Sequence, residues 1–277
     1  MSASLFRRGG LALLDDAVDR VRGDFFAFAL LQVLPSLPFF AGTLLWFVHT
    51  DLRGAVPEGE GGWLPLFLAP KVVGWGALSA WAAAGARGRP CSVGAAYLTS
   101  LRRLPEVALM SGVYLLSVIA GTFSLVGFVG VPVAFTGLAS AVADTRASGF
   151  SGLRRGLGAS TEDLGFSFVI LVVTALAWLF LVVNIVLLPA LLLLFGAGSL
   201  GVDLSQAGAA LAPDRSATWA LAGLCAWMLL EGVQVVAFAE LQRDREAERE
   251  GSRFDAFATE LESRAAQSER PARERVA

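Results

Sequence analysis

Histidine, lysine and cysteine are scarce in this chain. Its 277 residues include one histidine, His49, two cysteines, and a single lysine, Lys71, among 22 basic side chains. A lone histidine excludes metal sites and acid–base schemes that need several histidines. Cys91 and Cys225 are far apart in the sequence, and the second lies in an apolar run, which argues against a disulfide framework.

The sequence patterns of common enzyme classes are also missing. No Walker A loop, HExxH or GxSxG pattern occurs. The formal net charge of −2 gives no concentrated basic surface for phosphate backbones. We therefore expect no catalytic residue, no cofactor, no metal and no nucleic-acid partner.

Apolar residues, by contrast, are abundant. Hydrophobic residues make up 55% of the chain and charged residues 17%, and the mean hydropathy is +0.63. A bilayer core needs roughly 20 apolar residues for each helix that crosses it. The sequence thus predicts an all-α, polytopic membrane protein with six spans, at Phe25–Val48, Trp63–Gly85, Pro105–Gly121, Phe128–Ala143, Phe166–Leu188 and Ala217–Leu241.

The positions of the arginines predict the orientation of these spans. Lysine and arginine in short loops favour the cytoplasmic side. With the N-terminus inside, 19 of the 21 arginines are cytoplasmic, and only Arg53 and Arg215 are outside. This favours both termini inside. It also favours a single span in Phe166–Gly198, with a kink or an end at Pro189 that leaves Ala190–Gly198 re-entrant or interfacial.

Three regions follow from this organisation. Residues 1–24 place Leu11, Leu14, Val18 and Val21 on one helical face, which is typical of an amphipathic segment at the membrane surface or packed on the bundle. Residues 25–241 form the membrane domain. Residues 242–277 form a polar, charged cytoplasmic tail that we expect to be largely disordered.

Two ionisable residues stand out because they lie deep in predicted spans, where charge is costly. From the outer boundary, the helical rise places Lys71 about 12 Å deep and Glu231 about 21 Å deep. Their side chains could bridge this difference and join the second helix to the sixth. Snorkelling of Lys71 is an alternative. Gln32, Asn184 and Gln234 add polar groups that could line the same interior.

A second candidate site is the connection after the fourth span. Asp144, Arg146, Arg154 and Arg155 fall in a predicted cytoplasmic loop that could contact a partner. The alternative is a solvated connector with charges at helix ends.

Two stretches carry a resemblance to a known family. In VPVAFTGLASAVADTRASGFSGLRRGLGAS, residues 131–160, a Pro-Val step precedes Asp144, Gly149 and the pair Arg154–Arg155. In AELQRDREAEREGSRFDAF, residues 239–257, the last span runs into a basic stretch, Glu250–Gly251 and an acidic residue. These resemble the six-helix membrane domain fused to some bacterial glycerophosphodiester phosphodiesterases, and its stand-alone relatives.

This resemblance implies a stand-alone module of the bacterial cytoplasmic membrane that is concerned with envelope lipids or a partner protein. The phosphodiesterase domain itself is missing, and Asp144 stands where a glutamate is more usual. The resulting hypothesis is a non-catalytic scaffold or accessory subunit that contacts membrane lipids, a membrane protein or a second copy of itself. The alternative is a small transporter or lipid translocator with Lys71 and Glu231 in its pathway.

Overall fold

The protein is described by a computed structural model that covers residues 9–53, 64–124, 128–143, 164–199 and 222–249, with residues 154, 158 and 251 in addition. Within these ranges every regular element is a helix, and no strand occurs. The predicted all-helical class is therefore confirmed. Five helical stretches are long and apolar enough to cross a membrane, at Phe25–Thr43, Leu66–Ala86, Leu104–Gly121, Gly165–Asn184 and Ala222–Arg249.

The first of these stretches changes its helical type along its length. It consists of α2 (Phe25–Phe28), the π-helical turn η2 (Ala29–Val33) and α3 (Leu34–Arg53). Pro35 has no N–H to donate, and its ring crowds the carbonyl of Leu31 in a regular α-helix. The wider π turn immediately before Pro35 relieves this conflict and keeps the helix continuous.

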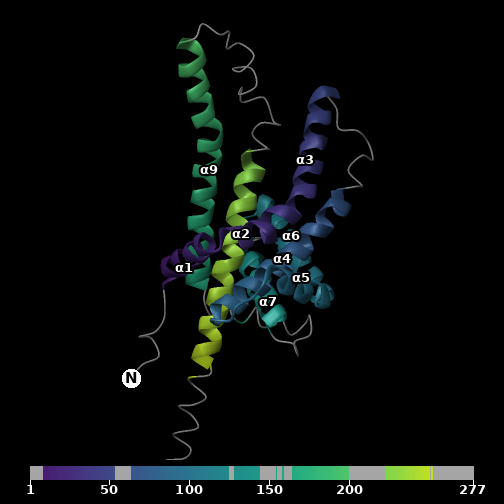
Figure 1. The fold of residues 1–277 in the computed structure, drawn as a ribbon, viewed down its shortest axis with the longest axis vertical. Helices are drawn as coiled ribbons and strands as arrows, with labels where there is room; N and C mark the ends of the chain where they lie inside the picture. The colour runs from purple at the N-terminus through teal and green to yellow at the C-terminus, as the bar shows by residue number, and fades with distance from the viewer. Residues whose placement is uncertain are drawn as a thin grey trace, which may run out of the picture.

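The amphipathic helix α1 (Gly10–Gly23) lies crosswise to the longer helices (Figure 1). Its inward face consists of Leu13, Leu14, Ala17 and Val21, whereas Leu11 is 63% exposed. The sequence predicts either a segment at the membrane surface or one packed on the bundle, and the structure shows packing on the bundle. The side chain of Asp24 then accepts a hydrogen bond from the Ala27 N–H and caps the start of α2.

The next three helices form one side of the bundle. They are α4 (Leu64–Ala86), the short helix α5 (Val93–Arg102) and α6 (Leu104–Phe123). This short helix lies between the predicted spans Trp63–Gly85 and Pro105–Gly121, where the sequence predicts no helix. Ser92 caps this helix by accepting a hydrogen bond from the Ala95 N–H.

The fourth predicted span is the short helix α7 (Gly130–Ala143), and all twelve residues from Val131 to Val142 are buried. Its 14 residues measure about 21 Å, less than the hydrocarbon core of a bilayer. It runs antiparallel to α6, because Gly130 meets Ser117 and Gly121 meets Phe128. A sixth crossing therefore remains a prediction.

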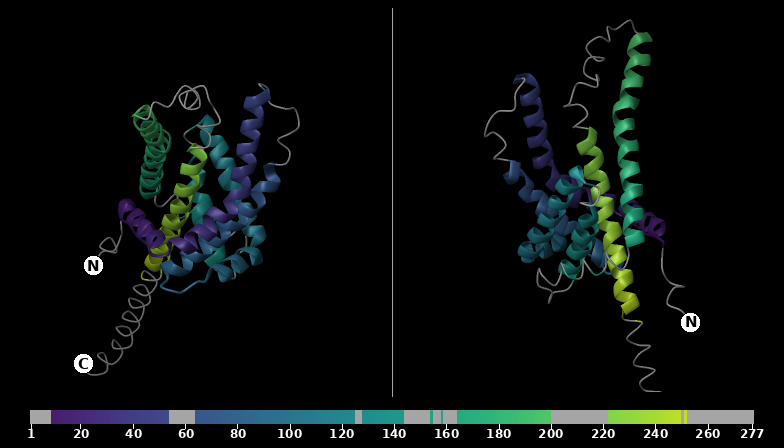
Figure 2. Two further views of the ribbon diagram at one scale, coloured as in Figure 1. Left: turned by 45° about the horizontal axis from the view of Figure 1, so that its top comes forward. Right: turned by 180° about the vertical axis from the view of Figure 1, so that it is seen from behind.

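The helix α9 (Leu164–Ser199) stands at the edge of the bundle beside the helix Ala222–Arg249, which is called the C-terminal helix below (Figure 2). The prediction of a separate piece after Pro189 is wrong, because α9 continues unbroken to Ser199. Among apolar neighbours, a break would expose several backbone groups, which costs more than the one hydrogen bond that proline removes.

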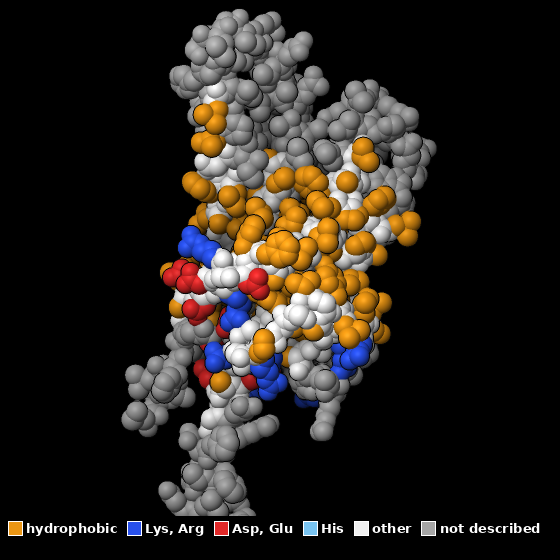
Figure 3. Space-filling model, in the orientation of Figure 1, with side chains coloured by type: hydrophobic (Ala, Val, Ile, Leu, Met, Phe, Trp, Pro, Cys, Tyr) orange, Lys and Arg blue, Asp and Glu red, His pale blue; other side chains and the backbone are white. Residues whose placement is uncertain are grey.

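The C-terminal helix extends beyond the predicted boundary at Leu241 as far as Arg249. Gln242 and Arg245 are buried, so the first part of the predicted tail belongs to the folded domain. Residues 252–277, which hold most of that tail, lie outside the described residues. Charged side chains gather around and below α1, whereas the described surface above them is mainly hydrophobic (Figure 3).

Candidate intramembrane ion-pair site

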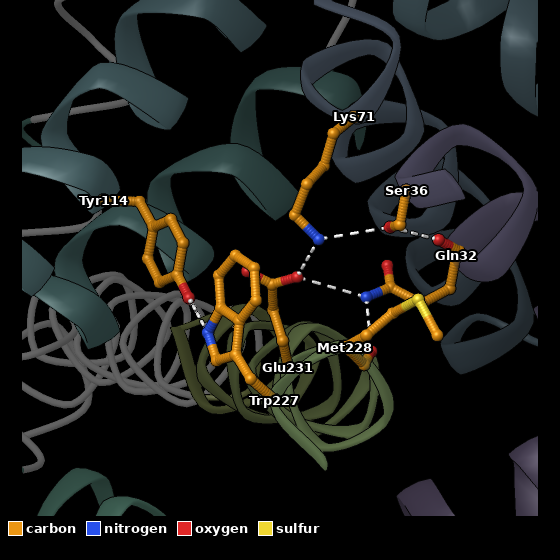
Figure 4. A network of polar contacts seen from close by, with 7 residues as sticks. All are labelled: Gln32, Ser36, Lys71, Tyr114, Trp227, Met228 and Glu231. Carbon is orange, nitrogen blue, oxygen red and sulfur yellow. Dashed lines mark hydrogen bonds and ion pairs between the residues drawn. The ribbon is translucent and has the colours of Figure 1, made fainter. Parts of the chain in front are cut away.

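The centre of the candidate site is a salt bridge between α4 and the C-terminal helix. Lys71 Nζ lies 2.6 Å from Glu231 Oε2, and the side chains are 1% and 0% exposed. The predicted contact between these residues is confirmed. Snorkelling is excluded, because the ammonium group points into the bundle and not toward its surface (Figure 4).

The turn η2 and the start of α3 supply the polar partners of this pair. Gln32 Nε2 donates to Glu231 Oε2 over 3.1 Å and to the Met228 carbonyl over 2.7 Å. Lys71 Nζ donates to Ser36 Oγ over 3.1 Å, and Ser36 in turn donates to the Gln32 carbonyl over 2.5 Å. Three helical segments are thus joined through one buried network.

Aromatic rings surround the same ammonium group. Lys71 Nζ lies 4.3 Å from the ring centre of Trp227 and 5.1 Å from that of Trp75. Trp227 Nε1 donates to the Tyr114 hydroxyl over 3.0 Å, and the Tyr114 ring packs edge-on against Trp75 with centroids 5.1 Å apart. Cation–π contacts of desolvated cations are worth about 2 kcal/mol. The rings therefore stabilise the cation where water cannot.

Helical spacing brings these groups together. Gln32 and Ser36, Lys71 and Trp75, and Trp227 and Glu231 are each four residues apart. Residues at this spacing share one face of a helix.

Two glycines allow the helices to approach closely enough for the network to form. A Cβ on Gly74 would lie 2.5 Å from Pro35 Cγ, and one on Gly232 would lie 2.6 Å from Phe28 Cζ. Both distances are too short for any larger residue to fit without displacing its neighbour. Because neither glycine has a side chain, α4 and the C-terminal helix can both approach the segment around η2 closely.

Two buried polar atoms at the site form no hydrogen bond with the described residues, namely Glu231 Oε1 and Trp75 Nε1. The Tyr114 hydroxyl points toward the Glu231 carboxylate and interacts with its charge (Figure 4). Oε2 of Glu231 thus accepts from both Lys71 and Gln32, and the Tyr114 hydroxyl lies beside the same carboxylate.

The other amide residues predicted for this site lie elsewhere. Gln234 Nε2 donates to Thr174 Oγ1 over 2.6 Å and joins the C-terminal helix to α9. Asn184 lies on α9 and donates to the Phe180 carbonyl of its own helix over 2.7 Å. Conversely, Ser36, Trp75, Tyr114 and Trp227 were not predicted. A serine one turn after Gln32 was the available signal for Ser36.

Three residues of the candidate cytoplasmic contact loop lie outside the described residues, namely Asp144, Arg146 and Arg155. Arg154 is described and is exposed. No cluster of three His, Cys, Asp or Glu side chains suited to a metal occurs in the part of the chain that the structure describes.

The C-terminal helix carries two further acidic residues that pair with cations from the first half of the chain. Glu240 pairs with Arg20 of α1, and Glu246 pairs with Arg87, which follows α4. Arg87 comes 16 residues after Lys71, and Glu246 comes 15 residues after Glu231. The two contacts therefore match in register, and α4 and the C-terminal helix run parallel.

Comparisons of the chain with protein-family models, with curated proteins and with solved structures found no match. The resemblance of residues 131–160 and 239–257 to the membrane domain of bacterial phosphodiesterases therefore stays a prediction.

Proposed function

We propose that the protein is a non-catalytic scaffold or accessory subunit of the bacterial cytoplasmic membrane, which contacts lipid or a partner protein through its helices. The observation that carries the proposal is the buried Lys71–Glu231 pair, whose charges are matched by each other and by side chains of the bundle. Such a site holds helices in place.

The arrangement of the helices supports six crossings with both termini inside. Because α4 and the C-terminal helix run parallel, an even number of reversals must separate them. The antiparallel hairpin of α6 and α7, followed by α9, meets this requirement if α7 serves as the short fourth crossing. Arg20, Arg87, Arg89, Arg102 and Arg103 lie at the ends of helices that the arginine distribution assigns to the cytoplasm.

Energetics also favour a structural role. Removal of one member of a buried ion pair costs about 3–5 kcal/mol, whereas replacement of both members by apolar residues is often neutral. A scaffold therefore tolerates the double replacement, provided that the helices still pack. A transporter that uses either charge in its cycle does not tolerate it.

The experiment compares wild type, Lys71→Met and the double variant Lys71→Met/Glu231→Leu. Each is tagged, crosslinked in native membranes and extracted, and the proteins recovered in stoichiometric amount are identified by mass spectrometry. The proposal expects one constant partner with wild type and with the double variant. A folded double variant that has lost this partner would overturn it, as would recovery of wild type with neither a partner protein nor reproducibly bound lipid.

A second candidate is a small transporter or lipid translocator. The burial of the Glu231 carboxylate and the π turn beside it favour this function. In liposomes with an internal pH dye, this candidate expects proton flux that depends on Glu231 and is lost in Glu231→Gln. Equal flux in empty, wild-type and variant liposomes would remove the candidate.

A further inference from the structure

The short helix α5 presents an unusual surface. Its inward face is fixed to the bundle, because the Tyr97 hydroxyl donates to the Leu30 carbonyl over 2.7 Å and Ser100 Oγ donates to the Val73 carbonyl over 2.8 Å. Gly76 of α4 lies directly beneath, where a Cβ would come 2.3 Å from Ser100 Oγ. The helix is therefore a rigid part of the fold with a defined outer face.

That outer face is apolar and carries a cation. Gly94, Ala95, Leu98, Leu101 and Arg102 are all exposed, and their spacing places them on one side of α5. Leu98 is 49% exposed and Leu101 is 54% exposed. In water, this arrangement would leave the apolar side of an amphipathic helix turned outward. At the boundary between headgroups and acyl chains, it is the expected arrangement of a helix that lies in the interface.

Two arginines flank this face. Arg102 ends α5, and Arg89 lies in the turn before it, three residues ahead of the capping Ser92. Both are exposed, and neither forms an ion pair with the described residues. This differs from Arg20 and Arg87, whose charges are matched by Glu240 and Glu246.

We propose that α5, with Arg89 and Arg102, is an interfacial binding surface for the anionic headgroups of membrane phospholipids. Leu98 and Leu101 enter the acyl region, and the two guanidinium groups bind headgroup phosphates from either end of the helix. Charge complementarity selects anionic over zwitterionic lipid. The inference adds a lipid class to the proposed membrane module. It depends on membrane embedding and not on the role of the Lys71–Glu231 pair.

The test uses the full-length protein in mild detergent with added dioleoyl phosphatidylglycerol or dioleoyl phosphatidylcholine, and native mass spectrometry counts the lipids that stay bound. A basic side chain near an anionic surface contributes about 1 kcal/mol, which is roughly fivefold in affinity. We expect Arg89→Gln/Arg102→Gln to weaken phosphatidylglycerol binding roughly 25-fold and to leave phosphatidylcholine binding unchanged.

Arg22→Gln is the matched control. Arg22 is also exposed, but it lies on α1 between Asp19 and Asp24, away from α5. Its substitution should leave binding unchanged, and Arg89→Lys/Arg102→Lys should retain most of it. Inorganic phosphate should not compete, because the leucines contribute only to lipid binding.

Three outcomes would overturn the proposal. They are unchanged phosphatidylglycerol binding in Arg89→Gln/Arg102→Gln, an equal loss in Arg22→Gln, and equal retention of both lipids by wild type. The unfolding temperature of each variant, measured without added lipid, shows whether a loss comes from misfolding. Failure here, together with a Lys71→Met/Glu231→Leu variant that keeps the partner found with wild type, would leave the proposed scaffold intact.

Discussion

The ammonium group of Lys71 lies over the indole ring of Trp227, 4.3 Å from its centre. One helical turn further along the same helix, Glu231 reaches the same nitrogen at 2.6 Å. A single helix therefore provides both an aromatic face and a carboxylate to one cation of α4. Because Lys71 has both partners on one helix, substitutions at Lys71 and Glu231 have predictable effects on the free energy of unfolding.

Loss of one charge should be far worse than loss of both. Lys71→Met leaves Glu231 buried without its ionic partner and should lower the free energy of unfolding by about 3–5 kcal/mol. Lys71→Met/Glu231→Leu should recover most of this loss. Denaturant or thermal unfolding in a fixed detergent gives the comparison. A double variant as unstable as the single one would show that the pair itself contributes net stability.

Gly74 should not tolerate a side chain. In Gly74→Ala, the new methyl group meets the Pro35 ring at 2.5 Å and pushes α4 away from the start of α3, which should cost about 1–3 kcal/mol. Gly112→Ala on α6 is the matched control, because nothing lies within 4 Å of its added Cβ. The control should be neutral or more stable by up to about 1 kcal/mol. Equal unfolding temperatures for the two variants would contradict the close contact.

The two amide residues Gln32 and Asn184 should behave differently. Gln32→Leu removes a donor to a buried carboxylate and should cost about 1.5–3 kcal/mol. Asn184 bonds only within its own helix among the described residues, so Asn184→Leu should change stability by less than about 0.5 kcal/mol. The free energy of unfolding of each variant is the measurement. A large effect at Asn184 would place it in a site that the structure does not show.

Cys91 offers a direct test of orientation. With Cys225→Ser as background, Cys91 is the one remaining thiol. A membrane-impermeant maleimide should label it in inverted membranes and not in intact spheroplasts. Burial raises the pKa of the Cys91 thiol above its ordinary value of 9.0, so labelling should be slow at pH 8 and should accelerate as the pH rises. Rapid labelling of Cys91 from outside the cell would contradict the proposed orientation, in which this residue faces the cytoplasm.

Tyr97 should make stability depend on alkaline pH. Burial raises the pKa of its phenol above the ordinary value of 10.0, so the folded protein holds this proton more tightly than the unfolded chain does. The contribution is complete below pH 10 and is lost as the pH rises above it. The difference in unfolding free energy between wild type and Tyr97→Phe should be constant below pH 10 and then shift against wild type. A constant difference throughout would show that the phenol is not buried in this way.

The contact of Lys71 with Glu231 could be predicted because the helical rise fixes the depth of each residue. Depth alone does not say which helices are neighbours. Asn184 was placed in the same interior on these grounds, yet α9 stands at the edge of the bundle and contacts the C-terminal helix with its other face. The contact of Trp227 with Lys71 could not be predicted, because an aromatic residue in a span usually indicates packing or lipid contact and not a cation site.

The sequence does not predict α5 for two reasons. The helix is short, and its apolar residues lie on the outer face, which is the reverse of the pattern expected for a helix on a water-soluble surface. Leu98 and Leu101 face outward while Ser100 is buried, so a reading that places apolar residues inside fails. The end of the C-terminal helix was misplaced for a related reason. The polar residues after Leu241 indicate solvent, but Gln242 and Arg245 are covered by the bundle.

The position of the matching acids has a consequence for biosynthesis. Glu231 follows Lys71 by 160 residues, and Glu240 follows Arg20 by 220. Because a chain is made from its N-terminus, Arg20, Lys71 and Arg87 all leave the ribosome long before the carboxylates that match them. The last helix therefore completes the bundle. Until the carboxylate of Glu231 is made, the nascent chain holds Lys71 without its ionic partner, so α4 cannot take its final place before the C-terminal helix does.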